Sequence, residues 1–134
     1  MSILAGQASV NGSNDGVGTD ATFTWPTGIT TDGINLYVGE WRHTIRKIEI
    51  STGVVTTFAG TAGSSGSTDG TGTDARFNQP TAITTDGKNL YVADTPAHLI
   101  RKIDISTGVV STYEASWNQG IQSPGGITTD GQNL

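Results

Sequence analysis

The sequence lacks cysteine, long apolar runs and an excess of positive charge, and each absence excludes a class of protein. Without cysteine the chain can form neither disulfides nor thiolate metal sites. No stretch approaches the roughly 20 apolar residues of a membrane-spanning helix, so no membrane partner is expected. With 12 Asp and Glu against 7 Lys and Arg, the net charge is −5, which disfavours nucleic acid as a partner.

Leu, Met, Glu and Lys, which dominate helical repeats, are scarce, whereas Gly (19 residues), Thr, Ser, Ile and Val are abundant. This is the composition of short strands joined by tight turns. Together with the absence of cysteine, it favours a secreted or cell-surface protein of a bacterium.

The sequence repeats itself with a period of 54 residues, since residues 31–38 recur as residues 85–92. The same pattern begins a third time at Thr129 and reaches Leu134. Periods of this size mark stacked supersecondary units, none of which can bury its apolar face alone. We therefore expect an array of similar units.

Each complete unit is predicted to contain four antiparallel strands joined by Asp-Gly and Ser-Thr-Gly turns. The predicted strands are residues 28–31, 35–38, 44–50 and 54–58 in the first unit and 82–85, 89–92, 99–105 and 109–113 in the second. A Gly-rich loop precedes each unit and carries Phe23 or Phe77, which we expect to anchor the loop onto the sheets. Four-stranded antiparallel units in series predict an all-β fold of the β-propeller type.

The resulting division of the chain has five parts. They are residues 1–25 (a last strand of a preceding blade at residues 3–6, then a Gly-rich loop), 26–60 (a first blade), 61–79 (a second Gly-rich loop), 80–115 (a second blade) and 116–134 (the start of a third). This makes an incomplete ring of about two to two and a half blades.

The second unit resembles an NHL-repeat blade. The motifs are Phe77-Asn78-Gln79-Pro80, Asp86-Gly87-Lys88-Asn89-Leu90-Tyr91-Val92-Ala93-Asp94, Ile100-Arg101-Lys102-Ile103-Asp104 and Thr107-Gly108-Val109-Val110. The first unit is similar, with Gly39-Glu40 in place of the usual Ala-Asp. The resemblance implies a propeller, usually of about six blades. It implies little about function, because NHL propellers include lyases, RNA binders and protein-binding scaffolds.

Arg46 and Arg101 occupy equivalent positions on the apolar face of the third strand, so both should be buried between sheets. A buried guanidinium needs a carboxylate partner, and Glu40 and Asp94 end the preceding strands. We predict the structural ion pairs Glu40–Arg46 and Asp94–Arg101. Their repetition favours a structural role, because a catalytic site would ordinarily be unique.

His43 and His98 also occupy equivalent loop positions, and neither belongs to a cluster with metal-ligand spacing. They are expected to be polar loop residues rather than metal ligands or general bases. Residues 11–16 and 67–70 alternate oxygen ligands as calcium loops do, but they lack the terminal Glu and flanking helices of an EF-hand. Asx-turns explain them better, so no metal and no cofactor are expected.

Because strands alternate in direction, the loops between second and third strands lie at the same end as the Gly-rich loops. This loop-rich face is predicted to hold the candidate binding residues Trp25, Trp41, Arg42, His43, His98 and Trp117. Exposed Trp and Arg are typical of binding surfaces, but tryptophans that cap blade edges would explain the same pattern.

Two functions fit these observations. The first is a non-enzymatic propeller module that serves assembly, or protein or glycan binding, through the loop-rich face. The second is a propeller enzyme, a lyase or hydrolase, whose catalytic residues lie outside this chain. Metal chemistry on a propeller axis needs His, Asp or Glu on the innermost strands, and residues 28–31, 82–85 and 126–129 contain none.

Two complete blades cannot close a ring, since propellers need about four to eight. We therefore expect the chain either to be part of a longer propeller or to form a homo-oligomer. Three chains with two blades each would make a ring of about six, in which the N-terminal strand completes a neighbour's blade.

Overall fold

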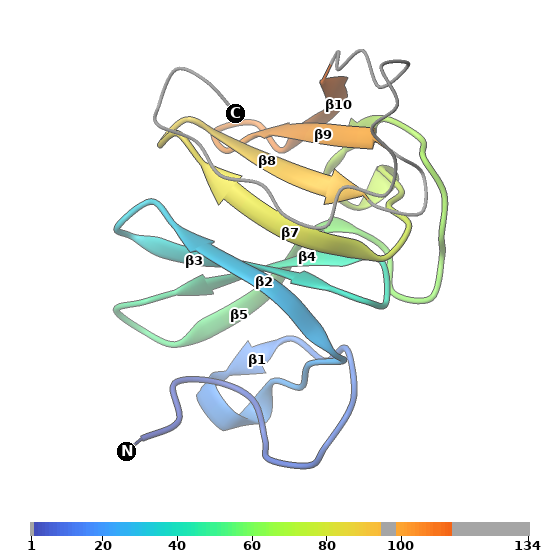
Figure 1. Ribbon diagram of the computed structural model, residues 1–134. Helices are drawn as coiled ribbons and strands as arrows, with labels where there is room; N and C mark the ends of the chain where they lie inside the picture. Colours follow the sequence, from blue (N-terminus) through green and yellow to red (C-terminus); the bar gives the residue numbers. More distant parts are fainter. Residues whose placement is uncertain (1, 95–98, 114–134) are drawn as a thin grey trace.

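The computed structural model describes residues 2–94 and 99–113, which form two five-stranded antiparallel sheets stacked against each other (Figure 1). Blade 1 has the order β1-β5-β4-β3-β2 and blade 2 the order β6-β10-β9-β8-β7. The strands of blade 1 are β1 (Gly16–Val17), β2 (Pro26–Thr31), β3 (Asn35–Glu40), β4 (Thr44–Glu49) and β5 (Val54–Gly60). Those of blade 2 are β6 (Gly70–Thr71), β7 (Pro80–Thr85), β8 (Asn89–Asp94), β9 (Leu99–Asp104) and β10 (Val109–Tyr113). All eight strands predicted from the sequence are present.

The turn between β2 and β3 shows why the repeated Thr-Asp-Gly motif ends one strand and begins the next. The Asp32 carboxylate accepts the N–H groups of Ile34 at 2.9 Å and Asn35 at 2.8 Å. Gly33 between them has φ +93°, a left-handed conformation that glycine adopts without steric cost. Asp86 makes the same two bonds in blade 2, so the register of both hairpins is set locally.

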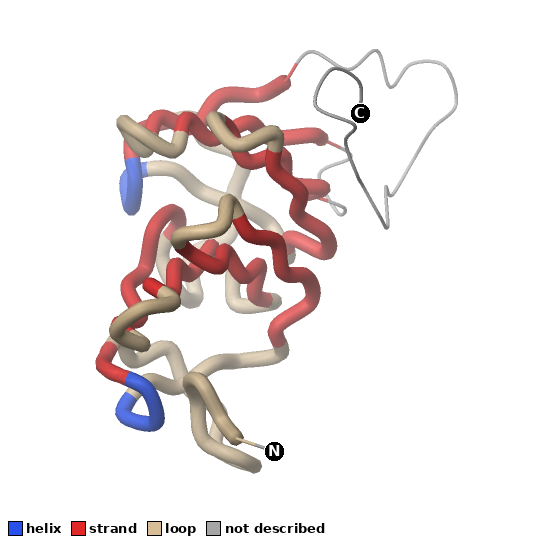
Figure 2. Tube along the Cα trace, turned by 90° about the vertical axis from the view of Figure 1, so that its left-hand side faces the viewer, coloured by secondary structure: helices blue, strands red, loops and turns tan. Residues whose placement is uncertain are grey.

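Each sheet has a fifth strand that the sequence prediction lacks. β1 and β6 come from the Gly-rich segments and pair with the outer strands β5 and β10. A 3₁₀ helix follows each of them, η1 (Gly18–Asp20) and η2 (Gly72–Asp74), and Figure 2 shows both on the same side of the molecule. An outer strand presents unpaired N–H and C=O groups, and the added strand satisfies some of them. Neither helix is long enough to cross a membrane.

Residues 3–6, predicted as the last strand of a preceding blade, form no strand in the structure. They nevertheless lie in the same position relative to Phe23 as the end of β5 does relative to Phe77. A Cβ added at Gly6 would be 3.1 Å from the Phe23 ring, just as one at Gly60 in β5 would be 3.1 Å from the Phe77 ring. Within the described ranges no strand pairs with residues 3–6, and the preceding blade to which they were assigned is not among these residues, so their role as its last strand stays a prediction.

The main core lies between the two blades. Its fully buried members are Tyr37, Ile45 and Ala59 of blade 1 and Ala75, Phe77, Leu90, Val92 and Ile103 of the second repeat. Phe77 is therefore an anchor, as predicted, and Phe23 packs on a second cluster around Val38 and Ile48. At Gly28 the inner strands β2 and β7 come so close that a Cβ would lie 3.1 Å from the Ala82 Cα atom.

Candidate functional site

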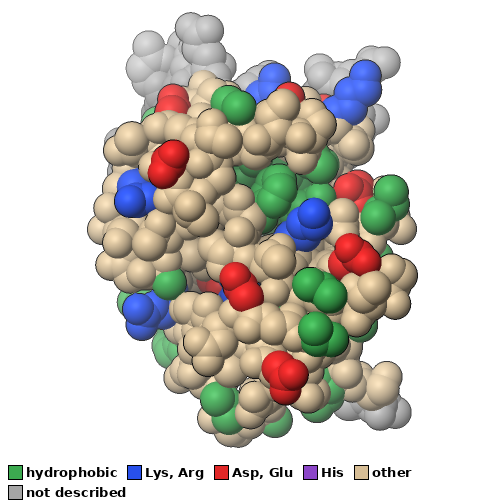
Figure 3. All heavy atoms as spheres, turned by 180° about the vertical axis from the view of Figure 1, so that it is seen from behind, with side chains coloured by type: hydrophobic (Ala, Val, Ile, Leu, Met, Phe, Trp, Pro, Cys, Tyr) green, Lys and Arg blue, Asp and Glu red, His purple; other side chains and the backbone are tan. Residues whose placement is uncertain are grey.

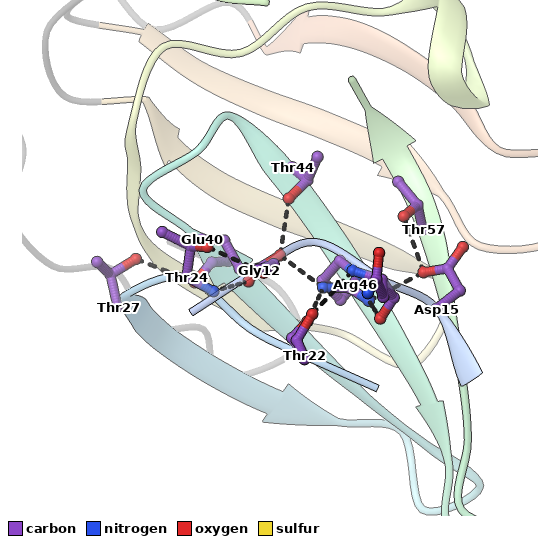
Figure 4. A network of polar contacts seen from close by, with 11 residues as sticks. Gly12, Asp15, Thr22, Thr24, Thr27, Glu40, Thr44, Arg46 and Thr57 are labelled. Atoms are coloured by element: carbon purple, nitrogen blue, oxygen red, sulfur yellow. Dashed lines mark hydrogen bonds and ion pairs between the residues drawn. The ribbon is translucent and has the colours of Figure 1, made fainter. Parts of the chain in front are cut away.

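Arg46 on β4 has a fully buried side chain that binds carboxylates from two directions (Figure 4). Its Nη1 donates to Glu40 Oε1 at 3.0 Å, and its Nη2 donates to Asp15 Oδ1 at 2.9 Å. The same nitrogens donate to the carbonyls of Thr22 and Asn14, each at 2.8 Å. One guanidinium thus holds the end of β3 and the Gly-rich segment together.

Blade 2 repeats this arrangement. Arg101 donates to Asp94 at 3.2 Å and to Asp69 at 2.9 Å, and also to the carbonyls of Arg76 at 2.7 Å and Thr68 at 3.1 Å. Both ion pairs expected from the sequence are therefore present, each with a second acidic partner. We call each set an arginine hub.

A phenylalanine lies under each hub. The Arg46 guanidinium carbon is 4.9 Å from the centroid of the Phe23 ring, and that of Arg101 is 5.0 Å from the Phe77 ring. A guanidinium over an aromatic face is stabilised by a cation–π interaction. The hub therefore joins three segments of each repeat, which explains why it occurs twice.

Asp15 and Asp69 were missed as partners, because the sequence suggested Asx-turns at these positions. Their carboxylates instead bind the arginines, and each Oδ1 also accepts a threonine hydroxyl of the outer strand, Thr57 at 3.0 Å or Thr112 at 3.1 Å. The available signal was the motif Asp-Gly-X-Gly-Thr-Asp-Ala-X-Phe, which precedes both units and accompanies a repeated buried arginine.

The two buried acids differ in their donors. Glu40 accepts the N–H of Thr24 at 2.6 Å and the hydroxyl of Thr44 at 2.9 Å besides the arginine. Within the described ranges, Asp94 accepts hydrogen bonds only from the N–H of Asn78, at 2.9 Å, and from the arginine. Burial raises the pKa of Asp94 to about 6, since these two donors offset only part of the hydration it has lost.

Trp25 and Trp41 lie against each other on the loop-rich face. Their ring centroids are 5.7 Å apart with an interplanar angle of 36°. Trp25 is 64% exposed and Trp41 is 45% exposed, so neither ring is covered as a buried cap would be. The Trp41 N–H donates to the Trp25 carbonyl at 3.2 Å and holds the two backbones together.

The two rings border a cavity of about 440 Å³ whose other lining residues are Thr24, Arg42, His43 and Gly63. Four of the six predicted binding residues therefore come together here, namely Trp25, Trp41, Arg42 and His43. His98 and Trp117 lie outside the described residues.

His43 ties this face to blade 2. Its Nδ1 accepts the N–H of Gln79 at 3.0 Å, which leaves the ring proton on Nε2. Burial, and then the positive charge of Arg42, lower the pKa of His43 below its ordinary value of 6.5. The neutral ring that accepts this hydrogen bond is therefore the form present at neutral pH.

The outer side of blade 1, which faces away from blade 2, is open. A cavity of about 540 Å³ there is lined by residues 3–5, 26–29, Phe23, Leu36, Val38 and Ile48, almost all apolar. Ile29 on this side is 59% exposed, whereas its counterpart Ile83 is 6% exposed because blade 1 covers it. Elsewhere, Figure 3 shows acidic and basic side chains interspersed over one face of the molecule.

Comparison with known proteins agrees with this architecture, although no protein-family model matches the chain. NHL repeat-containing protein 2 of Bos taurus is 38% identical over 107 residues, which is 76% of this chain and 15% of that protein. A structure of a protein of unknown function from Bacteroides thetaiotaomicron has a TM-score of 0.69 at 33% identity, over 78% of this chain and 26% of that one.

An auxiliary nutrient binding protein from the same bacterium shares the fold, with a TM-score of 0.71 at 20% identity over 85% of this chain and 34% of that one. This chain thus spans only a small part of each similar protein. The repeated strands, the turn motifs and these likenesses agree, and the chain belongs to the NHL-repeat β-propellers.

Proposed function

We propose that this chain is a non-enzymatic propeller module that binds a protein or glycan partner on the loop-rich face of blade 1, at Trp25 and Trp41. The observation that carries the proposal is that this exposed aromatic pair is absent from the second repeat. Gln79 stands where blade 1 has Trp25, and Thr95 follows Asp94 where Trp41 follows Glu40. Exposed tryptophan beside arginine is characteristic of binding hot spots.

The fold itself does not require a tryptophan at position 25. Trp25 has φ +47° and Gln79 has φ +53°, and a proline follows each of them. Both repeats thus have a left-handed conformation at this position, and glutamine adopts it as well as tryptophan does. A large ring held in this strained conformation and 64% exposed gains little from burial, so stability does not account for it.

The test is a screen of the purified chain against a glycan array and a peptide array. The variant Trp25→Gln/Trp41→Thr, which copies blade 2, should lose every ligand found while its far-UV circular dichroism stays unchanged. The matched control is Gln79→Ala, which alters the equivalent position of blade 2. Ligands retained by the tryptophan variant would place the site elsewhere and contradict the proposal.

A second observation favours assembly. Blade 2 shows how a face of this kind is covered in the molecule, because Tyr37 and Ile45 of blade 1 pack on it. The corresponding face of blade 1 keeps Ile29 exposed beside an apolar cavity, and exposed apolar patches of this kind mark interaction sites. We propose that another blade covers it, either in a longer propeller or from a second copy of this chain.

Light scattering tests the second-copy version. We expect a mass above that of one chain, reduced to one chain by Ile29→Asp, which places a charge at the centre of the face. Cooperative unfolding at the mass of one chain, with Ile29→Asp as stable as the parent, would contradict the assembly proposal in both forms.

The alternative is that the chain is part of a propeller enzyme of about six blades, a lyase or hydrolase, whose catalytic residues lie outside this chain. Within residues 2–94 and 99–113 no three His, Asp or Glu side chains are placed to hold a metal. Elemental analysis after dialysis separates the two functions, because a stoichiometric, tightly held Zn or Ca would favour the enzyme.

A further inference from the structure

We infer that the cavity beside Trp25 and Trp41 takes a hexuronate residue of an acidic glycan, with its sugar ring on the indoles and its carboxylate on Arg42. This inference rests on the proposed function and narrows it from protein or glycan to one chemical class. Three observations support it: the residues that line the cavity, the lack of an acidic partner for Arg42 among the described residues, and the close contact of Arg42 with Gly63.

The cavity combines an aromatic surface with polar walls. The two indoles are its only large apolar groups, and the remaining lining residues are Thr24, Arg42, His43 and Gly63. A pyranose ring has an apolar C–H face and polar edges, which suits this combination. An aliphatic side chain of a peptide would find no aliphatic wall here, so a sugar fits the lining better than such a side chain does.

Arg42 supplies a positive charge that pairs with no acid among residues 2–94 and 99–113. In the described ranges every ion pair belongs to Arg46 or Arg101. Glu40, two residues before Arg42 in the sequence, is fully buried and bound to Arg46. A guanidinium binds a carboxylate through paired N–H donors, so the carboxylate of a hexuronate can complete this site.

The space that Arg42 occupies depends on Gly63. A Cβ added at Gly63 would lie 2.9 Å from Arg42 Nη2, and the Gly63 N–H donates to the Arg42 carbonyl at 3.1 Å. A side chain at position 63 would therefore displace the guanidinium from its present position. Gly63 also has φ +79°, which favours glycine independently of this contact.

The chain as a whole carries a net charge of −5 and repels anions at long range. Attraction of a uronate therefore has to come from the local field of Arg42, which acts over a few ångströms. The lowered pKa of His43, caused first by burial and then by Arg42, agrees with an uncompensated positive charge at this place.

The experiment compares two forms of one sugar on the whole chain, followed by tryptophan fluorescence and calorimetry. The probes are an oligogalacturonate and the same oligomer with its carboxylates methyl-esterified. We expect the acidic form to bind about tenfold more tightly, since a carboxylate–guanidinium bond is charge-assisted. Arg42→Gln should reduce the difference to about twofold, and Gly63→Ala should do the same by displacing the guanidinium.

The controls separate this inference from the proposed function. Trp25→Gln should remove binding of both sugars, whereas Lys88→Gln, an exposed cation outside the cavity, should change neither affinity. Equal affinity of wild type for the two sugars would overturn the inference and leave the proposed function standing. Binding of neither sugar would also overturn it, and the array screen would then decide the proposed function on its own.

Discussion

Blade 1 and blade 2 share their arginine hubs almost atom for atom, and they differ at the loop-rich face. Arg46 and Arg101 each bind two carboxylates, two carbonyls and the face of a phenylalanine. By contrast, the exposed tryptophan pair belongs to blade 1 alone, since Gln79 and Thr95 replace it in the second repeat. In a repeat protein, contacts kept in both copies mark what the fold needs, whereas residues found in one copy are candidates for function.

Even within the hubs the copies differ in one respect. Thr44 donates its hydroxyl to Glu40, whereas the equivalent position of blade 2 is Leu99, which has no donor. A buried carboxylate with fewer hydrogen bonds is less stable as an anion. Within the described residues, the Asp94 carboxylate therefore has fewer hydrogen-bond donors than the Glu40 carboxylate.

The largest effect should come from removing a hub. Arg46→Ala and Arg101→Ala should each lower the free energy of unfolding by about 3–5 kcal/mol, because each leaves a fully buried carboxylate without its counter-charge. Urea denaturation followed by circular dichroism measures the loss. Similar losses in the two blades would support the equivalence of the hubs.

Two controls accompany this prediction. Lys88→Ala removes an exposed cation and should change stability by less than about 0.5 kcal/mol. Arg101→Met/Asp94→Leu removes both buried charges and should cost less than Arg101→Ala, because Asp69 remains half exposed and hydrated. A loss within error for Arg101→Ala would mean that the hub does not stabilise the fold.

The second largest effect concerns the contact between the blades. Gly28→Ala should cost about 1–3 kcal/mol, since the new methyl group would lie 3.1 Å from the Ala82 Cα atom and 3.3 Å from the Ile83 nitrogen. Thermal unfolding measures this loss of stability. The reverse change in blade 2, Ala82→Gly, should cost only about 0.5–1 kcal/mol through backbone entropy. Equal losses would show that the close approach of β2 and β7 carries no strain.

Much of this architecture can be predicted from the sequence because it is determined locally. The alternation of side chains and the Asp32 and Asp86 turns specify hairpins within a few residues of each other. An arginine on the apolar face of a strand requires a partner, and Glu40 is six positions away from Arg46. Local rules thus predict the strands and one acidic partner of each hub.

The features that sequence reasoning missed depend on distant segments. Asp15 reaches Arg46 across 31 positions and Asp69 reaches Arg101 across 32, so each pairing exists only once the Gly-rich segment has folded back. The short strands β1 and β6 arise from the same folding back. The exposure of Trp25 and Trp41 likewise depends on the pairing of β2 with β3, which the residue types alone leave open.

The third prediction concerns pH. Because the pKa of Asp94 is raised from 3.8 to about 6, the folded state holds this proton more tightly than the unfolded state does. The contribution of Asp94 to stability is therefore complete below pH 3.8 and is lost as the pH rises through about 6. Asp94→Glu/Leu99→Thr places a hydroxyl donor beside this carboxylate and should reduce the decline, because the added hydrogen bond stabilises the anion.

Urea denaturation from about pH 4 to about pH 8 measures this difference between wild type and the double variant. At neutral pH the variant should be more stable by about 1 kcal/mol, the contribution of one additional hydrogen bond. Glu40→Asp/Thr44→Leu, the reciprocal exchange in blade 1, should lower stability at neutral pH by a similar amount, because it removes the hydroxyl donor of that carboxylate. Parallel curves for wild type and the Asp94 variant would show that a hydroxyl donor does not change the pH dependence of stability.

The smallest effect on stability should come from the residue that most distinguishes the two blades. Trp25→Gln places the side chain of blade 2 on a backbone with nearly the same φ, +47° against +53°, and removes a ring that is 64% exposed. The free energy of unfolding, measured by urea denaturation, should therefore change by less than about 0.5 kcal/mol. Gln79→Trp, the reverse exchange, should be equally mild and should not create binding, because blade 2 has no second tryptophan at the position of Trp41. A loss above about 2 kcal/mol for Trp25→Gln would show that the ring supports the fold, and exposure alone would then no longer favour a binding role.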